Sequence, residues 1–274
     1  MHSILEEIVA DTRRRVAQAK RERPLELLPE LPLELSLEQA AESLPSGRVC
    51  SLREALAEPG LSFICEVKKA SPSKGLIAQE FDHLAIARSY EAAGAAAISV
   101  LTEPTFFQGS QGYLAEIAQE VSIPVLRKDF IIDEYQIYEA KMLNTQALLL
   151  IVALLDDDEL RHFIAFAADL GMDALVEAHT EQELTRALAA GATIVGVNNR
   201  DLNSFEVDLS RSLTLRKLVP PEVLFVAESG IHDANDVARL ASAGADAVLI
   251  GETLMRAADK AAALKALRGG DGGT

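Results

Sequence analysis

The strongest constraint on the fold is a rhythm that begins at Leu61, where short apolar runs alternate with polar loops and amphipathic segments. Such runs are typical of buried strands, and such segments are typical of helices. The predicted strands cover residues 61–67, 95–101, 123–128, 146–153, 172–177, 192–197, 223–227 and 245–250. The predicted helices lie near 82–93, 110–120, 134–143, 157–170, 180–190, 209–218, 233–243 and 253–267. This alternation predicts a parallel sheet, and eight units predict an α/β fold of the (β/α)₈ TIM barrel type.

A weak internal repeat supports this interpretation. Ala93-Gly94-Ala95, Ala190-Gly191-Ala192 and Ala243-Gly244-Ala245 each stand between a predicted helix and the strand that follows it. Glycine commonly ends a helix, because it adopts the left-handed conformation without strain. The chain contains neither GxGxxG nor GxxxxGK[ST], so the motifs of dinucleotide and nucleotide-triphosphate binding are missing.

Composition limits the partners and the compartment. The 274 residues carry a formal net charge of −16, which disfavours nucleic acids and anionic membranes as partners. With Cys50 and Cys65 as the only cysteines, we expect no disulfide framework. We find neither a signal peptide nor an uncharged apolar run of about 18 residues. These features predict a cytoplasmic protein.

The segment before the first predicted barrel strand has a different character. Apolar positions between Ile4 and Val16 follow helical spacing, whereas prolines interrupt residues 22–47. We therefore expect residues 1–60 to form a helical extension and residues 61–268 to form the barrel. Residues 269–274 are predicted to be a disordered glycine-rich tail.

Glu66 and Lys68 lie close to the end of the first predicted strand. Because they are two residues apart, their side chains point to the same face of that strand. If this face is the barrel interior, a carboxylate and an ammonium project together at the C-terminal mouth, where barrels build their active sites. An ordinary buried ion pair is the alternative for these two residues taken alone.

The ends of other predicted strands carry further polar residues. Lys128 ends the third strand, Glu177 the fifth, Asn198 follows the sixth and Glu228 the seventh. Each charge that is removed from water costs several kcal/mol unless it is paired. The convergence of two lysines, three glutamates and an asparagine on one mouth therefore favours catalysis over a purely structural role.

Two glycines, Gly230 and Gly251, follow the last two predicted strands. Barrels often bind phosphate there through loop N–H groups and the N-terminus of a short helix. Ser71, Ser229 and Lys74 could assist an anion, although each alone is an ordinary loop residue. The joint placement of Gly230 and Gly251 predicts a phosphate site.

The remaining candidates leave alternatives open. Phe107 and Phe130 could flank a planar ring, or they could cap the core. His179 could edge the site, or it could be a loop histidine with its polar atoms satisfied. The five histidines show no metal-ligand spacing, so no metal is expected.

The stretch Phe63–Ser73 resembles the signature of the indole-3-glycerol phosphate synthase family of tryptophan biosynthesis. Further similar segments occur in the family's order at residues 4–10, 99–103, 127–130, 197–202 and 226–231. One departure is Asn144-Thr145-Gln146, where the family usually has Gly-Ala-Asp. This turn precedes a strand, so it lies at the bottom of a barrel and affects stability more than catalysis.

The resemblance implies a barrel whose N-terminal extension lies across the mouth. It implies a carbon–carbon lyase, without a cofactor, that converts 1-(2-carboxyphenylamino)-1-deoxyribulose 5-phosphate into indole-3-glycerol phosphate, CO₂ and water. The implied catalytic residues are Lys128, Glu177, Lys68, Glu66, Asn198 and Glu228. The implied substrate-binding residues are Ser71, Phe107, Phe130, Leu149, Arg200, Ser229, Gly230, Leu249 and Gly251. Other enzymes of the tryptophan pathway are the expected protein partners.

The implied chemistry suits these residue types. Ring closure needs a protonated carbonyl, and the Lys128 ammonium is a matching general acid. The cyclised cationic imine is its own electron sink, so CO₂ leaves without pyridoxal phosphate or thiamine. The resemblance assigns loss of hydroxide to Lys68 and Glu177, with Glu66 orienting Lys68. It also places Asn198 on a substrate hydroxyl or carboxylate, Arg200 on the anthranilate carboxylate and Glu228 in the polar network.

Three other functions stay open at this point. A barrel aldolase would use Lys68 or Lys128 as a Schiff-base nucleophile. A sugar-phosphate isomerase would not need two lysines and three acids. A barrel that only binds phosphate would not need a general acid and a base.

Overall fold

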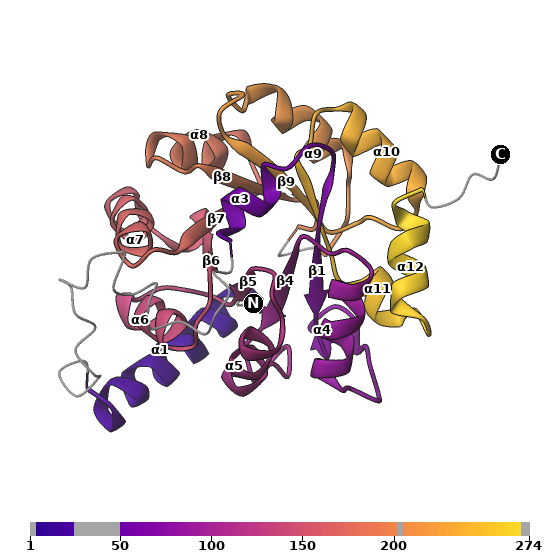
Figure 1. The fold of residues 1–274 in the computed structure, drawn as a ribbon. Coiled ribbons are helices and arrows are strands. Elements are labelled where there is room, and N and C mark those ends of the chain that lie inside the picture. The colour runs from indigo at the N-terminus through magenta and orange to yellow at the C-terminus, as the bar shows by residue number, and fades with distance from the viewer. Residues whose placement is uncertain (1–3, 25–49, 202–204, 270–274) are drawn as a thin grey trace.

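The computed structural model describes residues 4–24, 50–201 and 205–269. Within these residues, eight parallel strands close into a barrel (Figure 1). The barrel strands are β1 (Ser62–Val67), β4 (Ala97–Leu101), β5 (Val125–Lys128), β6 (Ala147–Ile151), β7 (Asp173–Ala178), β8 (Ile194–Asn198), β9 (Leu224–Glu228) and β10 (Ala247–Ile250). Because β1 pairs with both β4 and β10, the sheet has no free edge. The predicted TIM barrel is confirmed.

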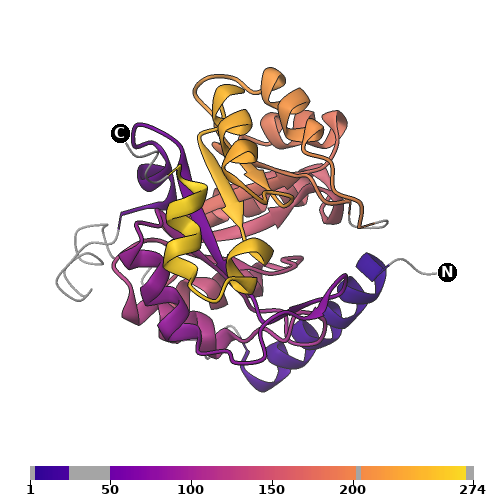
Figure 2. The same ribbon diagram turned by 90° about the vertical axis from the view of Figure 1, so that its right-hand side faces the viewer.

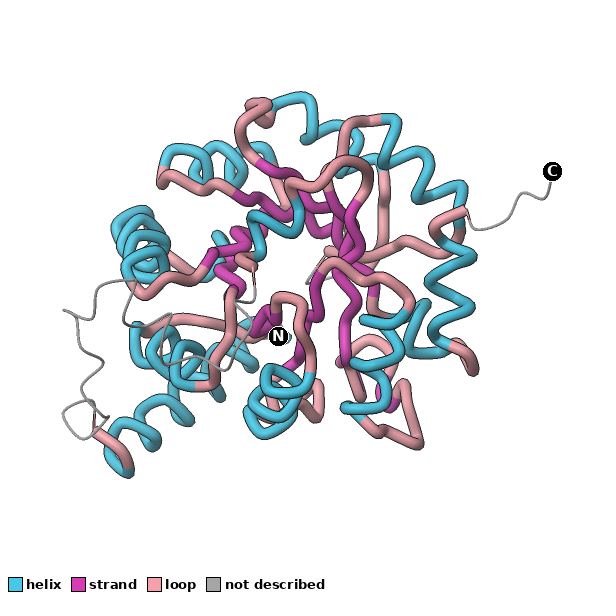
Figure 3. The backbone as a smooth tube through the Cα atoms, viewed as in Figure 1, coloured by secondary structure: helices cyan, strands magenta, loops and turns pink. Residues whose placement is uncertain are grey.

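Helices surround the strands on the outside, as Figure 3 shows. They are α4 (His83–Ala92), α5 (Gln111–Glu120), α6 (Glu134–Met142), α7 (Asp157–Asp169), α8 (Glu181–Ala189), α9 (Ser210–Leu215), α10 (Ala234–Ser242), α11 (Glu252–Arg256) and α12 (Lys260–Leu267). The N-terminal extension adds α1 (Ile4–Glu22) and α3 (Leu52–Leu56), which lie at the two ends of the barrel. Short 3₁₀ turns cover Val152–Leu154 and Arg216–Leu218. Polar N-caps begin many of these helices; Asp82, for example, accepts a hydrogen bond from the Ala85 N–H. No helix of the described residues is long and apolar enough to cross a membrane.

Side-chain alternation along β1 separates the structural face from the functional face. Phe63, Cys65 and Val67 belong to the apolar cluster that joins strands to helices. Ile64 belongs to the cluster that fills the barrel, and Glu66 lines the pocket at the mouth. Both faces are buried, which explains why β1 is an almost continuous apolar run.

The turns between helices and strands follow the sequence prediction. Gly94, Gly191 and Gly244 have φ angles of 87°, 92° and 86°, so glycine ends each of these helices in the left-handed conformation. Asn144, at the departure from the family pattern, takes the same conformation with φ 59°. Asparagine tolerates this region better than most residues, so the turn is retained without glycine.

Two segments differ from the predicted elements. The strand expected over 146–153 ends at Ile151, and a 3₁₀ turn follows. The loop expected after β1 contains a small antiparallel hairpin of β2 (Ala70–Ser71) and β3 (Gly75–Leu76). The hairpin holds Ser71 beside the mouth rather than in an open loop.

The extension contributes to both ends of the barrel. Figure 2 shows α1 at one end and the segment of α3 at the other. Leu52 and Leu56 of α3 are fully buried in the barrel's inner cluster. Arg53 donates hydrogen bonds to the carbonyls of Thr193 and Glu222, which precede β8 and β9. Helix α3 thus closes the bottom of the barrel.

Helix α1 lies at the mouth. The Tyr135 hydroxyl of α6 donates to the carbonyls of Ala19 and Arg23 at the end of α1, and Lys20 forms an ion pair with Asp133 at 2.7 Å. Residues 25–49 of the expected extension and residues 270–274 of the expected tail lie outside the described residues.

Candidate active site

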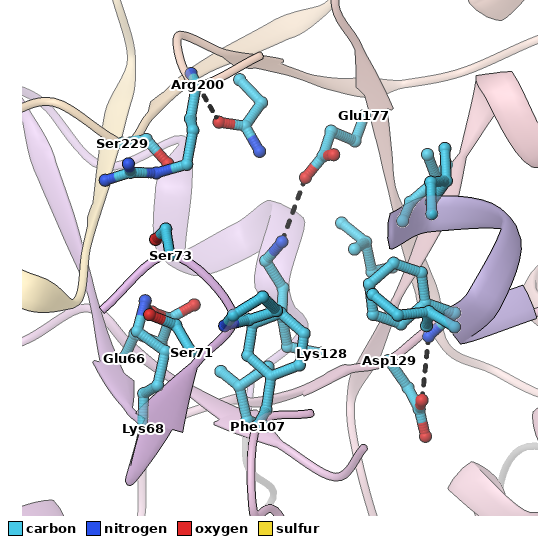
Figure 4. A pocket seen from close by; sticks show the side chains of 18 of the residues that line it. Glu66, Lys68, Ser71, Ser73, Phe107, Lys128, Asp129, Glu177, Arg200 and Ser229 are labelled. Carbon is cyan, nitrogen blue, oxygen red and sulfur yellow. Dashed lines mark hydrogen bonds and ion pairs between the residues drawn. The ribbon is translucent and has the colours of Figure 1, made fainter. Parts of the chain in front are cut away.

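A pocket of about 850 Å³, including the part open to solvent, lies at the C-terminal mouth of the barrel (Figure 4). One side of this pocket is apolar. Its apolar lining comes from α1 and from the loops and strands of the β4–β6 side: Ile4, Leu5, Ile8, Leu101, Phe107, Phe130, Leu149 and Ile151. The N-terminal helix therefore supplies part of the site's wall.

A second pocket of about 490 Å³ adjoins the first and is more polar. The two share part of their lining, namely Glu66, Lys68, Lys128, Arg200, Ser229 and Glu252. The rest of the second pocket comes from the ends of β9 and β10 and the loops after them: Glu228, Gly230, Ile231, His232, Leu249, Ile250, Gly251 and Thr253. Together the pockets form one site with an apolar end and a polar end.

The structure brings all the predicted catalytic and substrate-binding residues to this site, whereas the further candidates Lys74 and His179 line neither pocket. Among the predicted catalytic residues, the first pocket is lined by Glu66, Lys68, Lys128, Glu177 and Asn198, and the second by Glu66, Lys68, Lys128 and Glu228. Among the predicted binding residues, the first pocket is lined by Ser71, Phe107, Phe130, Leu149, Arg200 and Ser229, and the second by Arg200, Ser229, Gly230, Leu249 and Gly251.

Lys128 stands at the centre of the site, at the end of β5. Its Nζ lies 3.0 Å from Glu177 Oε2 on β7 and 3.4 Å from Glu228 Oε2 on β9. Figure 4 shows the Lys128–Glu177 contact, and it also labels Glu66 and Lys68, an ion pair at the C-terminal end of β1. Both partners of Lys128 are almost completely buried, so the three side chains form a tight charged cluster away from bulk water.

Burial and charge act against each other on this cluster. Burial alone would lower the pKa of Lys128, but the carboxylates of Glu177, Glu228 and Glu66 raise it above its ordinary value. Burial alone would raise the pKa of Glu177, but the charges of Lys128 and His179 lower it below its ordinary value. Lys128 is therefore an ammonium at neutral pH, and Glu177 is a carboxylate.

Glu228 is the exception among the three. Burial and the charge of Glu177 raise its pKa, and the Lys128 charge lowers it, with a net rise to about 8. Within the described residues, neither of its carboxylate oxygens has a hydrogen-bond partner. Gly196 on β8 makes room for this group, because a Cβ there would overlap the carboxylate. At neutral pH, Glu228 is a protonated donor that faces the pocket.

The polar end combines a strained backbone with a charged bridge. Ser229 has φ 65°, a left-handed conformation that non-glycine residues rarely adopt and that is concentrated at functional sites. Arg200 lies 3.3 Å from Glu252 at the start of α11, and Lys74 of the hairpin lies 3.6 Å from the same side chain. Asn198 Oδ1 accepts a hydrogen bond from the backbone N–H of Arg200 at 3.0 Å. This bond orients the Asn198 side chain at the end of β8.

The apolar end is organised around two phenylalanines. The rings of Phe107 and Phe130 are 6.0 Å apart at 40°, and both face the pocket. Between them and α1 there is space for a planar group, which aromatic side chains bind well. The buried carboxylate of Glu103 accepts hydrogen bonds from the N–H groups of Thr105, Phe106 and Phe107, and so fixes the loop.

Comparison with known proteins decides the family. The chain matches the family model described as indole-3-glycerol phosphate synthase over residues 5–267. The chain belongs to this family. A protein of Lachnoclostridium phytofermentans named indole-3-glycerol phosphate synthase is 49% identical over 267 residues, with 97% of this chain and 98% of that protein covered. One of the same name from Ruminiclostridium cellulolyticum is 51% identical over 266 residues, with 97% and 99% covered.

The indole-3-glycerol phosphate synthase family, a carbon–carbon lyase family of tryptophan biosynthesis, was predicted from the sequence and is confirmed. A solved structure named 3-hexulose-6-phosphate synthase has a TM-score of 0.60, with 77% of this chain and 99% of that chain covered. Its sequence identity is 17%, so this likeness supports the fold alone.

Some contacts of this indole-3-glycerol phosphate synthase site were not predicted. The resemblance implied that the N-terminal extension lies across the mouth, but Ile4, Leu5 and Ile8 were not named as residues of the pocket wall. Glu252 was not assigned a place in the charged bridge. His179 was left between two interpretations, and it lies 3.6 Å from Glu177. No motif signals the places of Ile4, Leu5, Ile8 and Glu252, because their contacts join segments that are distant in sequence. His179, by contrast, is only two residues from Glu177.

Proposed function

We propose that this site converts 1-(2-carboxyphenylamino)-1-deoxyribulose 5-phosphate into indole-3-glycerol phosphate, CO₂ and water. One observation carries the proposal: a continuous site has an apolar end, a polar end and the Lys128 ammonium between them. This substrate has an aromatic ring at one end, a phosphate at the other and a carbonyl between. The same order of groups along the site supports the assignment.

The two ends bind the substrate without moving protons. The phosphate lies at the loops that contain Ser229, Gly230 and Gly251, where backbone N–H groups and the start of α11 favour an anion. The anthranilate ring lies against Phe107 and Phe130. Arg200, which borders both pockets, meets the anthranilate carboxylate once that carboxylate displaces Glu252.

Ring closure is the first chemical step. The ring carbon that bears the carboxylate bonds to the substrate carbonyl carbon, and Lys128 gives its proton to the carbonyl oxygen. The electron pair comes from the arylamine, which becomes a cationic imine. The carbon–carboxylate bond then breaks, CO₂ leaves, and its electron pair neutralises that cation. Asn198 and the protonated Glu228 bind the new hydroxyl.

Dehydration is the second chemical step. Glu177, which is ionised, removes a proton from the ring carbon next to nitrogen, and Lys68 protonates the departing hydroxyl. The electron pair of the broken C–H bond forms the indole double bond, and water leaves. Glu66, paired with Lys68, keeps that ammonium turned toward the site.

Fluorescence of the indole product provides the test. We expect Lys128→Ala and Glu177→Gln to lower kcat by about 100-fold or more, because each removes a proton-transfer group. Lys217→Ala, a change at an exposed lysine, is the matched control and leaves turnover intact. Unimpaired turnover in Lys128→Ala would refute the general-acid role. Borohydride trapping with substrate would instead reveal a Schiff base. The Glu177 carboxylate, 3.0 Å from Lys128 Nζ, keeps that amine protonated and makes it a poor nucleophile.

We also propose a cytoplasmic location and contacts with other enzymes of the tryptophan pathway. The location is supported by Cys50 and Cys65 both being free thiols. Pull-down of the full chain with the enzymes that make its substrate and use its product would test the contacts. Failure of the chain to retain either of these enzymes would argue against the proposed contacts.

A further inference from the structure

A histidine lies behind the proposed base, on the side away from Lys128. His179 directly follows β7, and its Nε2 lies 3.6 Å from Glu177 Oε1. Its Nδ1 lies 3.4 Å from Glu183 Oε2 in the first turn of α8. The carboxylate of Glu183 also accepts the His179 backbone N–H at 2.7 Å, so both the ring and its backbone are held by one residue.

The contacts form an alternating row of charges. Glu177 uses Oε2 for Lys128 and presents Oε1 to His179, while Glu183 holds the far side of the imidazole. The side chain of His179 is only 10% exposed, and within the described residues its Nε2 has no hydrogen-bond partner. A buried nitrogen aimed at a catalytic carboxylate, without another partner, points to a role toward that carboxylate.

The charged groups around the imidazole come from four elements. Glu177 of β7, Glu183 of α8 and Glu228 of β9 act on it, and Lys128 of β5 stands beyond Glu177. Burial alone would lower the pKa of His179, but the Glu183 hydrogen bond and the Glu177 charge raise it above its ordinary value. The positive ring in turn contributes to the lowered pKa of Glu177.

We propose that His179, held by Glu183, is a positioning residue that keeps Glu177 ionised and turned toward Lys128. The inference rests on the proposed role of Glu177 as the base of the dehydration step. His179 itself does not line the pocket, and it acts on the substrate only through Glu177. Without its positive charge, the carboxyl group of Glu177 keeps its proton to higher pH and ceases to be a base there.

The first experiment measures the pH profile of kcat with His179→Gln and Glu183→Gln. An opposite charge at this distance lowers a carboxyl pKa by about 1 unit or more, so the acid limb moves to higher pH by about 1 unit in His179→Gln. Glu183→Gln moves it in the same direction by less, and it carries the test if His179→Gln does not fold. KM stays near the wild-type value, because no substrate contact is lost.

A matched control is His83→Gln. His83 also pairs with a glutamate, Glu116 at 2.6 Å, but this pair joins the outer helices α4 and α5. We expect the acid limb of the kcat–pH profile of His83→Gln to coincide with that of the wild type. Acid limbs that coincide with the wild type in both His179→Gln and Glu183→Gln would overturn the proposal, since a purely structural role changes the amount of folded enzyme and not the pH profile.

A second experiment does not depend on turnover. NMR titration of the His179 ring in the whole protein reports its pKa directly, and we expect it above the ordinary histidine value of about 6.5. Glu177→Gln and Glu183→Gln should each lower it. An unchanged pKa in Glu177→Gln would show that the two side chains do not interact. Absence of indole-3-glycerol phosphate formation by the wild type would instead refute the proposed function.

Discussion

Lys128, Glu177 and Glu228 form a buried triad with more carboxyl groups than ammonium groups. One ammonium cannot compensate two carboxylates that are both almost completely buried, so one of the acids keeps its proton. The hydrogen bonds decide which one. Glu177 accepts a hydrogen bond from Lys128 and has His179 behind it, whereas Glu228 Oε2 lies 3.4 Å from Lys128 Nζ and has no hydrogen-bond partner in the described part of the chain. At neutral pH, Glu177 is therefore ionised and the neighbouring Glu228 is protonated.

The protonated state of Glu228 predicts a pH-dependent stability. Folded Glu228 keeps its proton up to about pH 8, whereas an unfolded glutamate loses it near 4.5. Between these values the folded state binds more protons, so the free energy of unfolding falls as pH rises, by about 1.4 kcal/mol per pH unit. Glu228→Gln removes this decline. Urea unfolding at several pH values between these limits checks it, and parallel curves for both proteins would contradict it.

A missing side chain is as important to the site as those present. At Gly251 a Cβ would overlap the Glu66 carboxylate and lie 3.0 Å from Lys68 Nζ. We therefore expect Gly251→Ala to displace this pair and to lower kcat/KM by about 100-fold, the usual effect of a misplaced catalytic group. Steady-state kinetics measure this. Gly112→Ala in α5 is a control for the added methyl group, and equal losses in both variants would argue against the steric explanation.

The loop between β4 and α5 depends on one buried carboxylate. Glu103 is fully buried, binds three successive loop N–H groups and lies 3.5 Å from Arg15 of α1. Through these contacts it joins the position of Phe107 to that of the N-terminal helix. The loop between β4 and α5 and the helix α1 together build the apolar end of the site, and the Glu103 side chain fixes their relative position.

Glu103→Gln tests this arrangement. The amide keeps the size but loses the charge and one acceptor, so we expect the free energy of unfolding to fall by about 1–3 kcal/mol. KM should rise several-fold with a smaller change in kcat, since Phe107 binds the ring and moves no proton. Urea unfolding and steady-state kinetics give both quantities. Glu120→Gln, a change at the exposed end of α5, is the control. An unchanged KM in Glu103→Gln would contradict the expectation.

The whole molecule separates stability from chemistry along the barrel axis. The charged cluster lies at the C-terminal mouth, while α3 closes the opposite end with Leu52, Leu56 and the contacts of Arg53. This division is general for barrels of this type, because all parallel strands end on one rim. Substitutions at the two ends should therefore have different consequences.

Leu56→Ala tests that separation. The leucine is 1% exposed, and its loss should reduce the free energy of unfolding by about 2–5 kcal/mol. We expect kcat and KM of the folded enzyme to stay unchanged. Leu218→Ala removes a leucine that is 46% exposed and should alter stability by less than about 0.5 kcal/mol. A large fall in kcat in Leu56→Ala would show that the two ends are coupled.

The sequence by itself determined that the chain forms a barrel and which residues lie at the C-terminal mouth of that barrel. Alternating apolar runs and helix patterns specify parallel strands, and closure then brings every C-terminal end to one rim. For this reason Glu66, Lys128, Glu177 and Glu228 could be placed together although 162 positions separate the first from the last. The Gly94 turn was accessible from the sequence too, because local chemistry determines it. Phe107 and Phe130 were left open between a ring-binding role and a core-capping role.

Only the tertiary structure decided which side chains pair with each other and which end of the barrel each N-terminal helix covers. That Lys128 lies closer to Glu177 than to Glu228, and that α1 and α3 cover opposite ends of the barrel, cannot be derived from periodicity. Periodicity specifies which face of an element is buried. Pairing and pKa depend on differences of a few tenths of an ångström between atoms on separate loops, and these arise when the whole barrel packs.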